Sequence, residues 1–574
     1  MTTATNNARR SNGPAKGLVA LVDFAQASHA RAVGLLIAFA LIAFLPGFFQ
    51  IPPVDRDEAR FAQATKQMVQ SGDYIDIRFQ DEVRYKKPAG IYWLQAAVVK
   101  TAGALGADDA QTTIWLYRIP SLAGAIGAVL LTYWTALAFV TRRAAFIAAL
   151  MMASSILLGV EARLAKTDAM LLLTVLAAMG AMARIYLAQA RSPGTPAGWR
   201  WPAIFWTALA AGILLKGPLI LLFAGLAACT LIVADRSARW LLALRPVSGI
   251  LWMTVLVLPW FVAIVERAGD SFFIESLGRD MFAKVASGQE AHGAPPGYYL
   301  LLFWITFWPA AALAGLAAPV VWKARREPGA RFLLAWLIPA WIVFEAVVTK
   351  LPHYVLPLYP AIAILLAGIV ERNVFSENRW LVRGTMGWFL LPVVIGIAGI
   401  VGLVVIGRQP GFLAWPFAAA AIIFGLFAWR LYEVDGAERS LLRASAASVL
   451  VGITVYAVIF PSLTALFPGA ALAGLLKDAD CPRPLAAVAG IQEPSLVFLL
   501  GTETRFTDGA GAADFLRLGP CRFALVEARS ERSFVQRADA IGLRYAPGPP
   551  PVEGYNISNG RAVKIAIYRS QGEP

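Results

Sequence analysis

Thirteen stretches of this chain are apolar enough to cross a membrane, and no other feature restricts its fold as strongly. A spanning helix needs roughly 20 mostly apolar residues, with about 17–25 tolerated. The mean hydropathy of +0.62 over 574 residues is far too high for a soluble protein of this size. The sequence therefore predicts an all-α polytopic membrane protein, with spans at 33–50, 118–141, 144–160, 169–189, 202–215, 217–234, 247–265, 299–322, 332–348, 354–371, 384–406, 412–431 and 444–463.

The loops between these spans predict the orientation of the chain. Alternate loops are rich in Arg and Lys, including Arg142–Arg143, Arg325–Arg326 and Arg439–Arg443. Positively charged loops stay on the cytoplasmic side of a membrane, so the N-terminus is expected in the cytoplasm. Thirteen spans then place the C-terminus outside, which in a Gram-negative cell means the periplasm, with the protein in the inner membrane.

The net charge of +15 belongs to this pattern. Most Lys and Arg stand in short loops, where they set topology and meet anionic membrane lipids. The charge therefore does not indicate nucleic-acid binding.

The chain divides into two predicted domains. Residues 1–466 form a transmembrane domain, and residues 467–574 form a small soluble α/β domain outside the membrane. Strand-like runs at Leu496–Leu500, Phe523–Val526 and Ala562–Tyr568 are separated by turn signals. Cys481 and Cys521 both lie in this polar region, and a disulfide between them is left open, because sequence does not supply the geometry.

The first outward loop, residues 51–117, is unusual in its charge. Residues 51–92 hold seven acidic and seven basic residues in a chain of which 15% is charged. Asp55, Asp57 and Glu58 come directly after an apolar run, and Tyr85-Lys86-Lys87-Pro88 precedes the interfacial aromatics Tyr92 and Trp93. Residues 89–102 are expected to form an interfacial helix. Carboxylates and ammonium groups at the lipid boundary suit a lipid-linked anionic substrate.

Other outward loops carry a similar set of polar residues. One contains Glu161, Arg163, Lys166 and Asp168, and three further loops contain Lys216, then Glu290 with His292, and then Lys350 to Tyr354. Each charge alone is consistent with an ordinary wet loop. Together these loops predict an outward cavity with a carboxylate pair, several cations and two histidines.

Several motifs resemble glycosyltransferase family 39, which includes protein O-mannosyltransferases and lipid A aminoarabinose transferases. Asp57-Glu58-Ala59-Arg60-Phe61 resembles the Asp-Glu-x-Arg-aromatic motif of that family's first outer loop. The basic-Pro and Tyr-Trp segment follows in the family's order, as do Thr167-Asp168, Leu215–Pro218, His292 with Tyr298-Tyr299, and Lys350–Pro357. The resemblance covers residues 30–365 and favours the aminoarabinose-transferase branch.

The resemblance implies a GT-C type fold with an outward-facing catalytic cavity. It implies a glycosyltransferase that moves a sugar from a polyprenyl (undecaprenyl) monophosphate donor to a lipid A, other lipid, glycan or protein acceptor, with inversion. Asp57 would be the catalytic carboxylate and Asp168 the second acid. Lys87 would bind the donor phosphate, and the further substrate-binding residues would be Glu58, Arg60, Tyr85, Lys86, Arg163, Lys216, His292, Lys350, His353 and Tyr354.

A tightly bound metal is not expected, because Lys86 stands where several relatives have a metal-binding Glu. Glu290 and His292 stay open as a weak pair for a divalent cation. Two other functions are also left open. A flippase or transporter would place charges in an aqueous cavity but predicts repeated halves, which are not evident. An oligosaccharide ligase or polymerase would use a diphosphate-linked donor instead.

Overall fold

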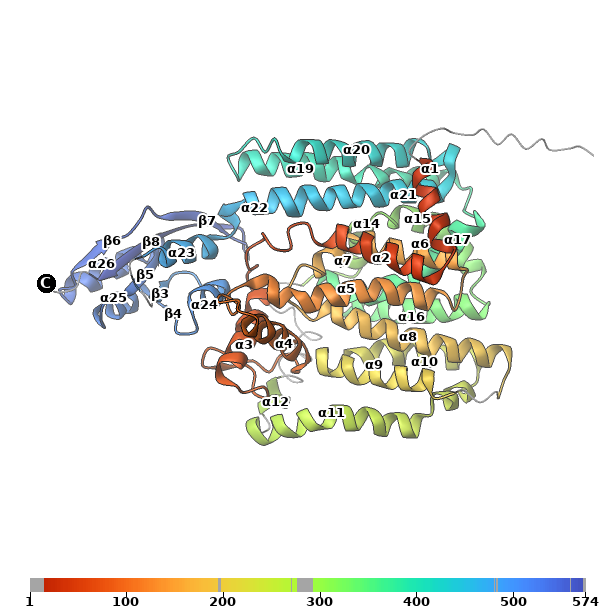
Figure 1. Ribbon diagram of the computed structural model, residues 1–574, viewed down its shortest axis with the longest axis horizontal. Coiled ribbons are helices and arrows are strands. Elements are labelled where there is room, and N and C mark those ends of the chain that lie inside the picture. The colour runs from red at the N-terminus through yellow and green to blue at the C-terminus, as the bar shows by residue number, and fades with distance from the viewer. Residues whose placement is uncertain are drawn as a thin grey trace, which may run out of the picture.

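The protein is a long helical bundle with a small sheet-containing region projecting from one end (Figure 1). The computed structural model describes residues 15–194, 198–269, 271–275, 293–479, 481, 484–557 and 559–570. The predicted class, an all-α polytopic membrane protein with a small C-terminal α/β region, is confirmed.

Helices of the bundle coincide with all thirteen predicted spans. Two spans each cover a broken pair of helices, because the chain leaves helical geometry at Ser155 and around Trp308-Pro309. The described helices are α1 (Ala15–Gln26), α2 (His29–Phe44), α5 (Ile114–Ala136), α6 (Arg142–Ser154), α7 (Ile156–Glu161), α8 (Asp168–Arg191), α9 (Arg200–Lys216), α10 (Leu219–Asp235), α11 (Pro246–Ala268), α12 (Ser271–Phe273), α14 (Tyr298–Thr306), α15 (Ala311–Lys323), α16 (Pro328–Ala346), α17 (Tyr359–Arg372), α18 (Arg379–Met386), α19 (Leu391–Val405), α20 (Ala414–Arg430), α21 (Tyr432–Gly452) and α22 (Phe460–Ser462).

Short turns of 3-10 or π type link or extend several of these helices. They are η1 (Arg239–Leu244), η4 (Pro352–Leu358), η5 (Gly387–Leu390), η6 (Ile453–Ile459) and η7 (Thr464–Leu466). Of these, η4 matters most for the site, because it carries His353 and Tyr354 to the start of α17.

The bundle has an inner and an outer layer of helices. Among the described residues, seven helical segments are long and apolar enough to cross a membrane, by length and composition. Within its most apolar stretch, Asp168–Arg191 is 78% buried, whereas Pro246–Ala268 is 17% buried. Helix α8 therefore lies in the centre of the bundle, and α11 lies at its edge. The exposed apolar side chains of α11 are suited to contact with lipid. The protein is therefore a multi-pass membrane protein.

Two helices lie between α2 and α5, an amphipathic one and a largely apolar one. They are α3 (Asp57–Ser71) and α4 (Gly90–Ala104), joined through a two-stranded hairpin of β1 (Arg78–Phe79) and β2 (Glu82–Val83). Both helices lie across the end of the bundle from which the C-terminal region projects (Figure 1). Gly90 allows a close approach there, because a Cβ at this position would lie 2.6 Å from the Leu214 carbonyl oxygen of α9. The segment that carries Lys87 is thus held beside the end of α9.

The C-terminal region contains a six-stranded mixed sheet. The strand order is β4-β3-β5-β8-β6, and β7 also pairs with β8. Strand β3 is parallel to β4 and β5, and β8 is antiparallel to β5, β6 and β7. The elements are α23 (Pro468–Lys477), β3 (Leu485–Ala489), α24 (Pro494–Leu500), β4 (Arg505–Thr507), α25 (Gly509–Arg517), β5 (Arg522–Glu527), α26 (Ala528–Ala540), β6 (Tyr545–Pro547), β7 (Val552–Asn556) and β8 (Arg561–Ser570).

Two of the three predicted strands are confirmed, as β5 and β8. The third, Leu496–Leu500, is wrong: these residues form most of helix α24. A short apolar run does not separate a strand from a buried helix by periodicity. Pro494 at the first helical position and Gly501 at the end, with φ 132°, are the stronger local signals.

A disulfide joins Cys481 and Cys521, the pair that the sequence left open. The bond ties the segment before β3 to the residue before β5. It therefore closes one end of the parallel strand pair at the middle of the sheet.

Candidate active site

Four elements bring polar side chains together inside the end of the bundle. Glu161 ends α7, Asp168 begins α8, Lys216 ends α9, and His353 lies in η4. Glu161, Lys166 and Asp168 are each less than 10% exposed. An Asp at a helix N-terminus is favoured by the helix dipole, and a Lys at a C-terminus is favoured by the same effect. Local helix chemistry therefore positions Asp168 and Lys216 to meet.

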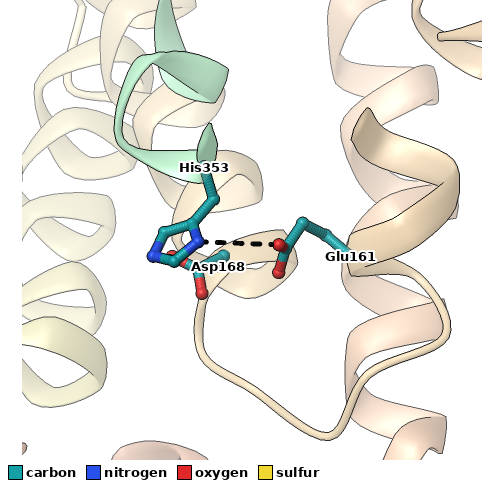
Figure 2. Close-up of side chains that lie close together, drawn as sticks. All are labelled: Glu161, Asp168 and His353. Carbon is teal, nitrogen blue, oxygen red and sulfur yellow. Dashed lines mark ion pairs between the residues drawn. The ribbon is translucent and has the colours of Figure 1, made fainter. Parts of the chain in front are cut away.

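The side chains of this cluster are linked by ion pairs. Lys216 forms an ion pair with Asp168, and Lys166 Nζ lies 3.1 Å from Glu161 Oε1 and 3.7 Å from Asp168 Oδ2. The His353 ring lies beside the carboxylates of Glu161 and Asp168 (Figure 2). Its Nδ1 lies 3.7 Å from Glu161 Oε1, and its Nε2 lies 3.6 Å from Asp168 Oδ1. The Tyr354 ring lies on one side of this cluster, with Lys216 Nζ 5.6 Å from the ring centre.

Asp57 faces the same cluster from the first outer loop. It is the first residue of α3 and is exposed, although many protein atoms surround its carboxylate. Burial of the carboxylate opposes ionisation, but the positive charges of Lys166, Arg84 and Arg60 lower the pKa of Asp57. The carboxylate is therefore ionised at neutral pH in a strongly positive setting.

The backbone turns sharply just before Asp57. Arg56 has a φ of 69° and a ψ of −106°, outside the regions that a non-glycine residue usually adopts. Strained backbone of this kind persists where the surroundings hold it, and it is common at functional sites. Here it directs the chain into α3 with Asp57 at the first position.

The predicted phosphate-binding segment runs beside α3. Lys86 is exposed and Lys87 is half-buried, with Lys87 Nζ donating to the Lys86 carbonyl at 2.8 Å. Tyr85 is buried, and its hydroxyl donates to Asp76 Oδ1 at 2.8 Å. Burial and the bond to Asp76 raise the pKa of this phenol. Tyr85 therefore anchors the segment, and Lys87 is the half-buried cation that it carries.

Glu58 has a different place from the one that its predicted substrate-binding role implies. Its side chain is 1% exposed and accepts hydrogen bonds from Arg118 at 2.8 and 2.9 Å. The backbone amides of Val54 and Ala165 occupy the same two oxygens. With every acceptor taken by protein donors, Glu58 holds the first loop against α5 and has no free oxygen for a substrate.

Arg163 and Lys350 also bind protein groups in place of the predicted substrate contacts. Arg163 donates to the carbonyls of Ala43, Pro46 and Gly159. Lys350 donates to three carbonyls at the end of α16, those of Phe344, Glu345 and Val347. Both side chains are buried, and each neutralises carbonyl groups that a helix end leaves unpaired.

The weak cation pair Glu290 and His292 lies outside the described residues.

Comparisons with known proteins agree with the resemblance read from the sequence. A family model described as dolichyl-phosphate-mannose-protein mannosyltransferase matches residues 35–269. The undecaprenyl phosphate-alpha-4-amino-4-deoxy-L-arabinose arabinosyl transferase of Edwardsiella ictaluri is 26% identical over 560 residues, which cover 94% of this chain and 91% of that protein. The chain is therefore similar to the mannosyltransferase family over residues 35–269 and to an aminoarabinose transferase over nearly its whole length.

Other relatives lie in the same branch of the family. The protein of the same description from Aeromonas salmonicida is 28% identical over 381 residues, covering 63% of this chain and 65% of that one. The crystal structure of ArnT from Cupriavidus metallidurans bound to undecaprenyl phosphate superimposes with a TM-score of 0.70 at 19% identity. The match covers 93% of this chain and 97% of that chain, so the similarity in fold includes part of the C-terminal region.

The buried cluster contains three groups that could in principle bind a metal. The ligand atoms of Glu161, Asp168 and His353 all lie within 4.8 Å of one another. However, two ammonium groups already pair with the two carboxylates, through Lys166 and Lys216. A divalent cation would need to displace both lysines or lie against them. We therefore assign the positive charge of this cluster to the lysines.

Three residues of this site have no individual role in the sequence-based prediction. Glu161 and Lys166 belong to a loop that is expected to line the cavity, and Arg84 stands in none of the motifs. Arg84 is 9% exposed, and its Nε has no hydrogen-bond partner among the described residues. Its position directly before Tyr85–Pro88 was the one available signal. Its charge influences Asp57 because the chain returns past the start of α3 after the hairpin of β1 and β2.

Proposed function

We propose that this protein is an inner-membrane glycosyltransferase that transfers a sugar from a polyprenyl-monophosphate donor to an acceptor on the periplasmic face. The observation that carries the proposal is the meeting of Asp57 with a buried cluster of carboxylates and ammonium groups at the end of the bundle. The names of the relatives support undecaprenyl phosphate as the carrier. They make 4-amino-4-deoxy-L-arabinose the first sugar to test, and lipid A the first acceptor.

The proposed orientation places the N-terminus in the cytoplasm and the C-terminal region in the periplasm. Two independent features support it. The loops rich in Arg and Lys stand at the opposite end of the bundle from Asp57, and the Cys481–Cys521 disulfide suits an oxidising compartment. The division at residues 466 and 467 into a transmembrane and a soluble domain is part of the same proposal.

The proposed reaction is a single displacement at the anomeric carbon. The bond from this carbon to the acceptor oxygen forms while its bond to the donor phosphate breaks, so the configuration inverts. The polyprenyl monophosphate leaves with the bonding electrons. An acceptor hydroxyl gives its proton to Asp57, whose lowered pKa keeps it ionised before the reaction. An acceptor phosphate has no proton to give at neutral pH, and Asp57 would then orient it.

The remaining residues have electrostatic roles in this proposal. Lys87 and Arg60 stabilise the charge that develops on the leaving phosphate, and Arg84 and Lys86 add positive charge nearby. Asp168 keeps Lys216 and Lys166 in place, and His353 bridges Asp168 to Glu161. Tyr354 lies beside Lys216.

The decisive experiment compares lipid A, membrane lipids and glycans by mass spectrometry in cells with and without the gene. We expect a sugar-modified species that disappears with the gene and returns with the wild-type copy. Purified protein should then use an undecaprenyl-monophosphate sugar and not a diphosphate-linked oligosaccharide. Use of the diphosphate donor would favour a ligase or polymerase, and movement of the lipid without sugar transfer would favour a flippase.

A further inference from the structure

The C-terminal region is hydrogen-bonded to the first outer loop at Asp55, two residues before Asp57. Asp55 accepts hydrogen bonds from the Ser495 backbone amide at 2.8 Å and from the Ser495 hydroxyl at 2.7 Å. These residues are 440 positions apart in the chain. Both carboxylate oxygens of Asp55 are therefore held by the first turn of α24.

A second carboxyl group faces Asp55 at this contact. Glu493 is 3% exposed, and its carboxyl group lies near that of Asp55. No N–H or O–H donor among the described residues reaches its Oε2. Burial and the charge of Asp55 raise the pKa of Glu493 to about 9. Two neighbouring buried carboxylates repel each other when both are ionised, so this contact favours a protonated Glu493 beside Asp55.

The rest of the contact involves several buried and half-buried side chains. Lys66 of α3 is 4% exposed and donates to the Phe498 carbonyl at 2.8 Å. Phe498 is fully buried against Tyr117, with ring centres 5.2 Å apart. Gln80, in the hairpin after α3, donates to the Thr502 carbonyl at 3.0 Å. The segment from Glu493 to Thr504 thus fixes α3 at its start, its middle and the turn beyond its end.

We propose that Glu493 and Ser495 are positioning residues for the transfer reaction. By holding Asp55, they fix the strained turn at Arg56 and hence the place of Asp57. The C-terminal region is then a working part of the active site, although it contributes no group to the reacting atoms. This inference rests on the proposed function, because Asp57 must act in transfer for its position to matter.

The test uses the full-length protein in detergent, with undecaprenyl-phosphate aminoarabinose as donor and lipid A as acceptor. Glu493→Ala is expected to lower kcat about tenfold and to leave the donor KM within about twofold, because the donor phosphate is bound by other residues. Glu493→Gln is expected to keep kcat within about twofold, since an amide can donate to Asp55 as a protonated carboxyl does. Glu553→Ala is the matched control, an exposed Glu in the same region paired with Lys564.

A further readout separates positioning from simple folding. Above pH 9 the wild-type kcat should fall as Glu493 loses its proton beside Asp55, which also faces Arg60. Glu493→Gln should not show this fall, and Ser495→Ala should lose kcat even if Glu493→Ala does not accumulate.

Three outcomes would overturn the inference. They are a normal kcat in Glu493→Ala at normal abundance, an equal loss in Glu493→Gln and Glu493→Ala, and identical pH profiles for wild type and Glu493→Gln. A wild-type protein that transfers no sugar would instead reject the proposed function.

Discussion

At the scale of single residues, similar charged side chains have very different roles in this protein. Asp57 and Glu58 are adjacent, yet Glu58 is sealed against Arg118 while Asp57 faces the cluster of lysines. A helix turns by about 100° per residue, so neighbouring residues at the start of α3 point to different sides. Substitution of Glu58 should therefore affect folding, whereas substitution of Asp57 should affect the transfer reaction.

Asp57→Asn should reduce transfer at least about a hundredfold while the protein accumulates and unfolds as the wild type does. The change removes the charge with little change in volume, and Asp57 is exposed. Asp168→Asn should also lose most activity, because it frees Lys216 and weakens the contact with His353. Transfer by purified variants is the measurement, and near-normal transfer by either variant would remove that residue from the proposed mechanism.

Lys87→Ala should weaken use of the donor by about tenfold or more. Hydrogen bonds to charged groups contribute about 1.5–3 kcal/mol, and each 1.4 kcal/mol is about one decade. Lys86→Ala should have a smaller effect, because Lys86 is exposed whereas Lys87 is half-buried. Donor titrations of both variants decide between them. A larger defect in Lys86→Ala would move the phosphate contact to the other cation.

Removal of divalent metal should leave transfer unchanged. Lys166 and Lys216 already supply the positive charge that Glu161 and Asp168 need. The check is the transfer rate of purified protein before and after treatment with a strong chelator and after added Mn²⁺ or Zn²⁺. A loss on chelation with recovery on metal addition would show that an ion acts in the reaction.

At the scale of elements, α3 is the helix on which the site depends. It packs against α4, contacts α24 and begins with Asp57. The contact with α24 buries the ammonium group of Lys66, which disfavours its charged form. Burial, with the nearby charge of Lys477, lowers the pKa of Lys66 to about 8. A charged group at this contact is tolerated because the Phe498 carbonyl accepts from it.

The contact of α24 with α3 should weaken as pH rises. The pKa of Glu493 is raised from 4.5 to about 9 in the folded protein, so the folded state holds a proton that the unfolded state releases. Its contribution to stability is complete below about pH 4.5 and is lost as pH rises through 9. Thermal unfolding of wild type and Glu493→Gln at pH 5, 7 and 9 measures this. An equal pH dependence in both proteins would contradict the prediction.

At the scale of the whole molecule, the bundle is asymmetric. One end carries α3, α4 and the C-terminal sheet, and the other end carries short loops rich in Arg (Figure 1). The charged cluster, the first outer loop and the C-terminal region therefore lie at the same end of the bundle.

Reporter fusions should map this arrangement. Fusions after Arg143, Arg326 and Arg372 should be cytoplasmic, because they follow or lie within the positively charged loops. A fusion at the C-terminus should be periplasmic. Activity of paired alkaline phosphatase and fluorescent protein fusions gives the readout, and a cytoplasmic C-terminus would contradict both the thirteen-span prediction and the proposed site of transfer.

The sequence by itself determined the fold class and the approximate place of the apolar helices of the bundle. In lipid, backbone N–H and C=O groups must form hydrogen bonds within the protein, so long apolar segments fold as helices. It also singled out Asp57, Asp168, Lys216, His353 and Tyr354, because charge is rare in this chain and stands out at the ends of apolar runs.

Only the tertiary structure decided which charges face the site and which support the fold. Glu58, Arg163 and Lys350 are as polar as Asp57, and their partners lie on distant segments that no local pattern connects. The helix at Leu496–Leu500, the Cys481–Cys521 pair and the contact between Asp55 and Ser495 depend in the same way on long-range packing. Propensity and periodicity describe a residue and its near neighbours, whereas these features are set by groups that folding brings together.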